Sequence, residues 1–438
     1  MVSKATGSLL GTFLLAVFCV TQADAQTEHI LRRFLGAAKD GASPQAALIA
    51  DAAGNLYGTT VYGGKANLGG VCAVQSLDVG CGTVFEISPP AEPGGRWTET
   101  ILYEFVDGND GALPSGPLVM DETGSLYGET QYSGAQSAYG GTVFELSPPT
   151  IPGGRWTETT LHSFGASGDG TYPLGGLVLD TQGNLFGTTN GGGSGKCGTA
   201  FELTPSQGTW AETIIFDFQG SGGCAPTSGL VTSDFVNFYG TTGGGDPDDN
   251  SVYRLSQATD AWKLVTLYDF SDDDSTTPQG PLAISKGALY GTTVYGGGTA
   301  CGGQGCGTVY QYSFANGFKV VHRFLVDSTD GIYPQAVTAD ESGNLYVTTL
   351  GGGGNPECVD NVNGCGAIVE LTPPGEQGGP WVNTTLYGFS GFNGDGASPV
   401  GAVLLKRGAI LGTTAYGGDD YCGIGSNEGC GTVFALTK

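Results

Sequence analysis

Apolar and polar residues alternate along short stretches of this chain, and glycine-rich turns separate one stretch from the next. Residues 97–105 (WTETILYEF) place polar and apolar side chains on opposite faces, as a half-buried β-strand does. Residues 54–60 (GNLYGTT) read as a second kind of strand. No window has helical periodicity after the N-terminus, so the pattern predicts an all-β protein.

The heptapeptide 54–60 recurs along the chain, at residues 124–130, 183–189, 237–242, 287–293, 343–349 and 408–414. Such recurrence at a regular spacing indicates a repeat array. Within one unit the order is a short apolar strand (118–120), a tight turn (121–124), the heptapeptide, a glycine-rich loop, a third strand (141–146) and a Trp-led fourth strand after a Pro/Gly turn (148–154). Four short antiparallel strands per unit are typical of a propeller blade.

The two ends of the chain complement each other. The chain after residue 25 opens with a fourth strand (29–34) that has no blade before it, and it closes with a third strand (431–436) that has no fourth strand after it. Pairing these ends would remove the exposed edges of an open array. We therefore predict a seven-bladed β-propeller of four-stranded antiparallel blades, formed by residues 26–438 as a single domain and closed by pairing of the N-terminal strand with the C-terminal blade.

Three motifs carry a family resemblance. The core D-x-x-G-N-L-Y-G-T-T, the strand G-C-G-T-V-F-E and the strand W-T-E-T-x-L-Y-x-F resemble the GloVer-type tandem repeats of exported bacterial proteins. The resemblance spans nearly the whole chain after residue 25. It implies secretion or tethering to the cell surface, and it implies no particular activity. Because this sequence lacks the C-terminal anchor segment of such proteins, we expect no tether.

Residues 1–25 have the features of a signal peptide. Lys4 supplies a positive charge, residues 9–20 (LLGTFLLAVFCV) form a short apolar core, and residues 23–25 (ADA) form a small-x-small cleavage site. The alternative is an N-terminal membrane anchor, for which this apolar core is too short. We expect cleavage near Gln26, a secreted or periplasmic protein, and no membrane insertion after that point.

Ten cysteines remain once Cys19 has left with the signal peptide, an even number that suits disulfides in an oxidising compartment. We predict five disulfides: Cys72/Cys81, Cys301/Cys306, Cys358/Cys365, Cys422/Cys430 and, as the remaining pair, Cys197/Cys224. Zinc binding would favour closer C-x-x-C spacing and more than the three histidines of this chain. We therefore expect no metal and no cofactor. The formal net charge of −26 would repel phosphates and argues against nucleic acid as a partner.

The long connections between strands, which carry all the predicted disulfides, should emerge on one face of the propeller. This long-loop face also carries an acidic turn, D-G-x-x-P, whose aspartates are Asp40, Asp110, Asp169, Asp330 and Asp395. We name these five as candidate binding residues, because loops on a rigid scaffold often carry function. The structural alternative is that Asp before Gly simply stabilises a turn by hydrogen bonding to its own backbone.

One residue departs from the repeat in a suggestive way. Glu129 replaces a threonine that the other six heptapeptides have, and a lone carboxylate on a second strand is costly to bury unpaired. Glu129 with Asp110 is the one carboxylate pair that we nominate for catalysis. His162 and His322 occupy a position that is tyrosine in other units, on the outermost strand, so we do not assign them a catalytic role.

These observations favour a non-catalytic, monomeric scaffold that binds an extracellular carbohydrate or protein through its disulfide-held loop face. A secreted polysaccharide-cleaving enzyme, either a hydrolase or a lyase acting through carboxylates on that face, is one alternative. A purely structural envelope protein is the other. No motif of a known hydrolase, metalloprotease or dinucleotide-binding enzyme appears in the sequence.

Overall fold

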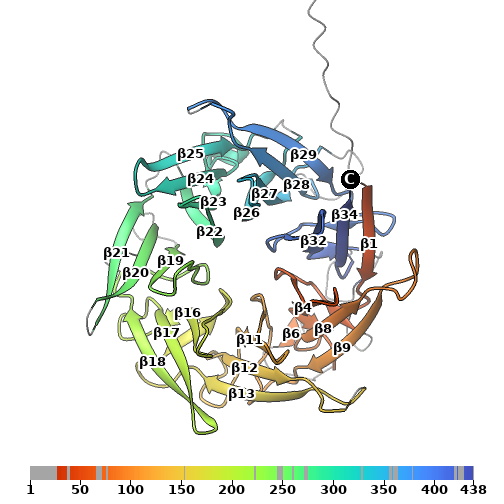
Figure 1. The fold of residues 1–438 in the computed structure, drawn as a ribbon, viewed down its shortest axis with the longest axis vertical. Helices are drawn as coiled ribbons and strands as arrows, with labels where there is room; N and C mark the ends of the chain where they lie inside the picture. Colours follow the sequence, from red (N-terminus) through yellow and green to blue (C-terminus); the bar gives the residue numbers. More distant parts are fainter. Residues whose placement is uncertain are drawn as a thin grey trace, which may run out of the picture.

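A computed structural model of the chain shows seven small antiparallel sheets arranged as blades around a central axis, which confirms the predicted seven-bladed propeller (Figure 1). The structure describes residues 27–36, 40–65, 72–74, 77–151, 153–220, 223–243, 250–258, 261–270, 275–326, 329–354, 358, 364–376, 378–418, 422 and 429–437. The predicted signal peptide and cleavage site lie outside these residues. No helix in the described part of the chain is long and apolar enough to cross a bilayer.

The first four blades follow the chain in order. Blade 1 comprises β3 (Ile49–Ala50), β4 (Leu56–Thr60), β8 (Thr83–Ser88) and β9 (Thr98–Glu104). Blade 2 comprises β10 (Val119–Met120), β11 (Leu126–Thr130), β12 (Thr142–Ser147) and β13 (Thr157–Ser163). Blade 3 comprises β14 (Gly170–Pro173), β15 (Val178–Leu179), β16 (Leu185–Gly192), β17 (Thr199–Ser206) and β18 (Thr209–Asp217). Blade 4 comprises β19 (Asn237–Thr242), β20 (Ser251–Ala258) and β21 (Ala261–Asp269), and its first strand is reduced to one bridge between Val231 and Tyr239.

The remaining three blades complete the ring. Blade 5 comprises β22 (Ser275–Ser285), β23 (Ala288–Gly296), β24 (Thr308–Ser313) and β25 (Gly317–Arg323). Blade 6 comprises β26 (Ile332–Ala339), β27 (Leu345–Gly351), β28 (Ala367–Thr372) and β29 (Val382–Gly388). Blade 7 comprises β31 (Leu404–Lys406), β32 (Ala409–Thr414), β34 (Thr432–Thr437) and β1 (Thr27–Arg33). The connections hold the short strands β2 (Gly41–Ala42), β5 (Tyr62–Gly63), β6 (Ala73–Val74), β7 (Leu77–Asp78), β30 (Gly396–Ala397) and β33 (Tyr416–Gly417), and the short 3-10 helix η3 (Cys301–Gly303).

Blade 7 shows how the ring closes. The N-terminal strand β1 pairs antiparallel with the last strand β34, from Thr27 opposite Thr437 to Arg33 opposite Thr432. The two strands lie side by side in Figure 1 although they come from opposite ends of the chain. Because the two terminal strands pair, no strand edge is exposed where the ends of the chain meet, as the sequence predicted.

A glycine on the second strand faces an aromatic ring on the third strand in six of the seven blades. The pairs are Gly58–Phe85, Gly128–Phe144, Gly187–Phe201, Gly240–Tyr253, Gly291–Tyr310 and Gly412–Phe434. At Gly128 a Cβ would come within 2.6 Å of the Phe144 ring, so the ring fits only because the side chain opposite is missing. Blade 6 replaces both partners, with Val347 opposite Val369.

The same aromatic rings join neighbouring blades. At six of the seven blade interfaces, the phenylalanine at the end of the fourth strand packs against the third-strand ring of the next blade, with centroids 5.1 Å apart for Phe34–Phe85 and 5.2 Å apart for Phe105–Phe144. The first of these pairs links β1, and therefore blade 7, to blade 1. The equivalent contacts elsewhere are Phe164–Phe201, Phe218–Tyr253, Phe270–Tyr310 and Phe389–Phe434. The core is thus a ring of interblade aromatic pairs.

All five predicted disulfides are present. They join Cys72 to Cys81, Cys197 to Cys224, Cys301 to Cys306, Cys358 to Cys365 and Cys422 to Cys430. Four close within a single second-to-third-strand connection, whereas Cys197–Cys224 joins two neighbouring connections. Five disulfides fit an extracellular or periplasmic location.

Gly128→Ala tests the packing of glycine against the aromatic ring. The added methyl group would overlap the Phe144 ring, so we expect a loss of about 1–3 kcal/mol of unfolding free energy, measured by thermal or denaturant unfolding. Gly375→Ala is the control, because a Cβ there meets nothing within 4 Å. The double change Gly128→Val with Phe144→Val copies blade 6 and should recover part of the loss. Equal stability of Gly128→Ala and the wild type would contradict this account of the core.

Candidate functional site

A groove with a volume of about 850 Å³ lies on the long-loop face between blades 1 and 2. Its aromatic lining consists of Tyr62, Tyr132 and Tyr139, all of which come from second-to-third-strand connections. Tyr139 is 59% exposed, so its ring is available to a ligand. Tyr132 is held edge-on against Tyr172 of blade 3, with centroids 5.4 Å apart. The groove therefore has both a fixed aromatic wall and an exposed one.

Polar groups stand between these rings. The lining includes Gln45, Asp107, Ser115, Gln131 and Ser133. The Ser133 hydroxyl contacts the Asp107 carboxylate, which connects two loops of the groove. Ser115 Oγ is buried and has no hydrogen-bond partner within the described part of the chain. Amide, hydroxyl and carboxylate groups beside aromatic rings can recognise a polar ligand that has apolar faces.

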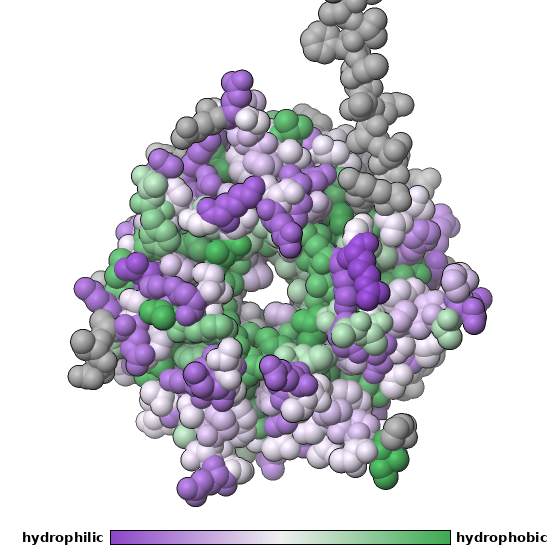
Figure 2. Space-filling model, viewed as in Figure 1, coloured by the Kyte–Doolittle hydropathy of each residue, from purple (hydrophilic) through white to green (hydrophobic). Residues whose placement is uncertain are grey.

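The groove continues into the centre of the ring. A cavity of about 270 Å³ is lined by segments of all seven blades and shares Gln45, Ser115 and Gln131 with the groove. In the space-filling view an opening lies at the centre of the ring, with apolar and weakly polar residues around it (Figure 2). A ligand in the groove would thus lie beside the mouth of this central channel.

The disulfide Cys72–Cys81 supports the floor of the groove. Both cysteines are fully buried in the same core cluster as Leu113, and Tyr62 and Tyr132 pack against that cluster. The cross-link closes a short loop, which limits how far the groove walls can move. Burial and the neighbouring Tyr132 raise the pKa of Tyr62, so its hydroxyl stays protonated and can donate a hydrogen bond.

The five candidate aspartates lie at the outer rim, between adjacent blades, and their carboxylates are used within the protein. Asp40 Oδ1 accepts hydrogen bonds from the backbone N–H groups of Leu35 and Gly36, at 2.6 and 3.1 Å. Asp395 likewise accepts from the Ser390 and Gly396 N–H groups, both at 2.6 Å. These bonds fix the turn that follows the fourth strand.

Each aspartate also meets one side chain from the fourth strand of its own blade and one from the fourth strand of the next blade. These rim clusters are Arg32–Asp40–Glu99, Tyr103–Asp110–Glu158, His162–Asp169–Glu212, His322–Asp330–Asn383 and Tyr387–Asp395–Glu28. The remaining two interfaces lack the aspartate in the described residues and bring apolar or aromatic groups to the same positions. One of them stacks Tyr268 on Phe318, with ring centroids 3.7 Å apart.

The glutamates of these rim clusters were not among the predicted site residues. Burial and the neighbouring Asp395 raise the pKa of Glu28 to about 8. Burial and Asp40 raise the pKa of Glu99 to about 7, and burial also raises the pKa of Glu158 to about 7. The sequence signal was present, since each glutamate stands six residues before the phenylalanine that ends its strand. Only the contact between blades shows that the glutamates and aspartates belong together.

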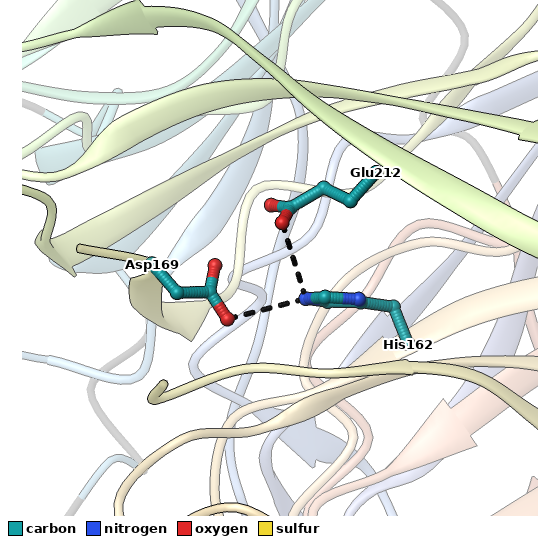
Figure 3. A group of neighbouring side chains, drawn as sticks. All are labelled: His162, Asp169 and Glu212. Carbon is teal, nitrogen blue, oxygen red and sulfur yellow. Dashed lines mark hydrogen bonds and ion pairs between the residues drawn. The ribbon is translucent and has the colours of Figure 1, made fainter. Parts of the chain in front are cut away.

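His162, Asp169 and Glu212 form the rim cluster between blades 2 and 3 (Figure 3). His162 Nε2 lies 3.2 Å from Asp169 Oδ2 and 3.6 Å from Glu212 Oε2. The cluster opens into a cavity of about 570 Å³ that is also lined by Gln136 and Ile214. Burial alone would lower the pKa of His162, but the hydrogen bond to Asp169 and the charges of Glu212 and Asp169 raise it.

Glu129 is buried within the interface between blades 2 and 3. Its Oε2 accepts a hydrogen bond of 2.8 Å from the Gly176 N–H of the next blade, and its Oε1 has no partner among the described residues. Four of the six threonines at this repeat position instead donate to a carbonyl of the next blade, as Thr188 does to Ser228 at 3.0 Å. Burial raises the pKa of Glu129 to about 8. The carboxyl group thus takes over an interblade contact from the threonine hydroxyl.

The structure places the nominated pair Glu129 and Asp110 in different surroundings. Glu129 is buried on the second strand β11, where it contacts Gly176 of the next blade. Asp110 is at the rim, where its Oδ2 accepts from the Tyr103 hydroxyl at 3.1 Å and from the Val106 N–H at 3.2 Å. No hydrogen bond joins Glu129 to Asp110 in the described part of the chain.

The fold and its repeats define a class, the tandem-repeat β-propellers. The Gloeobacter/Verrucomicrobia repeat model matches residues 16–250 and 72–304, so the chain belongs to this family, as its motifs suggested. No curated protein matches the sequence.

Several solved structures are similar to this chain. The PQQ-bound aldose sugar dehydrogenase of Streptomyces coelicolor is 14% identical, with a TM-score of 0.44, and the match covers 79% of this chain and 97% of that one. A putative 6-phosphogluconolactonase of Bacteroides uniformis is 15% identical, with a TM-score of 0.47 and coverage of 75% and 84%. A luciferin-regenerating enzyme is 12% identical, with a TM-score of 0.45 and coverage of 94% and 95%. Likeness at this level carries no inference about function.

Glu129→Gln tests the buried carboxyl group. The pKa of Glu129 is about 8 in the folded protein and near 4.5 when exposed, so its protonation stabilises the fold below pH 4.5 and this contribution is lost as the pH rises through 8. An amide keeps the acceptor for Gly176 but does not ionise. We expect the unfolding free energy of the variant to fall less steeply with pH, by up to about 1.4 kcal/mol per pH unit in this window. Glu92→Gln changes an exposed glutamate and should keep the wild-type pH dependence of stability. Identical pH profiles of the wild type and both variants would contradict the raised pKa of Glu129.

Proposed function

We propose that this chain is a secreted or periplasmic carbohydrate-binding propeller, and that the groove between blades 1 and 2 holds an uncharged oligosaccharide. The observation that carries the proposal is the combination of Tyr62, Tyr132 and Tyr139 with amide and hydroxyl groups in one groove. Sugar rings have apolar faces that stack on aromatic side chains and hydroxyl groups that need hydrogen-bond partners. The volume of the groove, about 850 Å³, lies in the range of small-molecule sites.

Charge narrows the class of ligand. The formal net charge of −26 disfavours acidic polysaccharides, because like charges repel over the whole surface. The groove itself contributes one carboxylate, Asp107, which is available as a hydrogen-bond acceptor for sugar hydroxyls. Neutral glycans are therefore the favoured ligands.

The same lining favours binding over cleavage. A glycoside hydrolase uses two carboxyl groups about 5–10 Å apart on either side of the scissile bond. Among the described residues that line the groove, Asp107 is the one carboxylate. Glu129, the other nominated acid, is buried and bonded to Gly176 instead of lining the groove. A non-catalytic binding protein is the reading that this arrangement supports best.

Tyr139→Ala and Tyr132→Ala test the proposal against a panel of neutral oligosaccharides. Loss of an aromatic platform of this kind should weaken binding at least about tenfold, which is about 1.4 kcal/mol. Isothermal titration with the best glycan of the panel gives the dissociation constants.

Tyr295→Ala is the matched control. Tyr295 stands at the same repeat position as Tyr132, in blade 5, and packs edge-on against Tyr333 with centroids 5.7 Å apart, so it reports any general effect on the fold. The affinity of the Tyr295→Ala variant for the glycan should equal that of the wild type. Equal weakening in the control, or no binding to any glycan of the panel, would overturn the proposal.

A further inference from the structure

The rim cluster of His162, Asp169 and Glu212 differs from the other rim clusters in the groups that it offers. It brings one imidazole nitrogen and two carboxylate oxygens within 4.8 Å of one another. Imidazole nitrogen and carboxylate oxygen are two donor types that zinc and similar divalent metals accept from proteins, alongside cysteine. We propose that this cluster is a binding site for a divalent transition-metal ion, with zinc as its representative.

The distances suit such an ion. Tetrahedral zinc with bonds of about 2.0–2.1 Å to nitrogen and oxygen separates neighbouring ligand atoms by about 3.3–3.4 Å. His162 Nε2 lies 3.2 Å from Asp169 Oδ2 and 3.6 Å from Glu212 Oε2, close to that separation on either side. In Figure 3 the Nε2 atom points between the two carboxylates, so an ion on its lone pair would face both of them.

The surroundings hold the ligands in place and leave room for a fourth. Asp169 is oriented by the backbone N–H groups of Gly165 and Gly170, at 3.2 and 2.6 Å. The His162 ring packs edge-on against Phe164, with centroids 4.6 Å apart. The cavity of about 570 Å³ over the cluster gives access to solvent, so water or a ligand group can complete the coordination.

A protonated imidazole serves the cluster less well than a metal ion. One N–H proton on Nε2 can be directed at only one carboxylate, and the 3.6 Å separation from Glu212 is too long for a good hydrogen bond. Glu212 Oε1 is also buried without a hydrogen-bond partner among the described residues. A metal ion bonds all three side chains at once.

Two other rim clusters show which groups this rim position can hold. Between blades 7 and 1 the Arg32 guanidinium stands between Asp40 and Glu99, so this rim position accommodates a positive charge between two carboxylates. Between blades 5 and 6 the cluster is His322, Asp330 and Asn383, in which a neutral amide replaces the glutamate. From the sequence we expected no metal, because the cysteine spacing and the three histidines of the chain did not favour zinc. The contact between His162 and Glu212 of the next blade could not be predicted there.

Zinc titration of the chelator-treated full chain at pH 8 tests the proposal, because fewer protons compete with the metal for the His162 imidazole at higher pH. We expect one equivalent of zinc to bind the wild type. His162→Ala and Glu212→Gln should each weaken this binding at least about 100-fold, whereas His322→Ala should leave it unchanged. Circular dichroism confirms that each variant is folded.

Two further measurements keep the test decisive if a loss-of-ligand variant unfolds. Asn383→Glu should convert the rim cluster between blades 5 and 6 into a second site and raise the zinc stoichiometry to two. Cobalt(II) bound to the wild type should give the visible absorption of a tetrahedral site. The proposal is wrong if the wild type binds neither zinc nor cobalt, because the imidazolium would then be the only cation of the cluster. It is also wrong if zinc binding is unchanged in both His162→Ala and Glu212→Gln.

Discussion

An aromatic ring that fits over a glycine is the contact on which the propeller depends. Gly128 leaves room for the Phe144 ring within one blade, and the same ring receives Phe105 from the preceding blade. One residue pair therefore sets both the packing within a blade and the spacing between blades. The coupled change to Val347 and Val369 in blade 6 shows the same constraint, because a larger residue on one strand accompanies a smaller one opposite.

A rigid ring of this kind allows the sequences of the loops and the rim to vary. Three departures from the repeat lie in blades 1 to 3. The tyrosine-lined groove lies between blades 1 and 2, and the buried carboxyl of Glu129 lies between blades 2 and 3. The cluster of His162, Asp169 and Glu212 lies at the rim of that second interface. The loop 133–139 lies between groove and cluster, since its residues line both cavities. Binding and metal coordination would thus be neighbours on one sector of the long-loop face.

The sequence was sufficient for the features that repeat locally. Strand order, ring closure by β1 and the five disulfides follow from patterns within one unit and from the two incomplete ends. Contacts between units were harder to predict, because a residue's partner lies a full repeat away. Asp110 and Glu158 appear unrelated in sequence although they share one rim cluster, and Glu129 could be recognised as a misfit but not paired with Gly176. The groove was missed because its tyrosines belong to two different units, which only the contact between blades brings together.

The central claim is that function resides on the long-loop face of blades 1 and 2. Hydrogen exchange of the full chain, measured with and without a neutral oligosaccharide, tests it most directly because it surveys every loop at once. The account predicts slower exchange in residues 107–115 and 131–139, which form the groove, and unchanged exchange in the tight turns of the opposite face such as residues 121–124. Protection confined to that opposite face, or no protection with any neutral glycan, would contradict it.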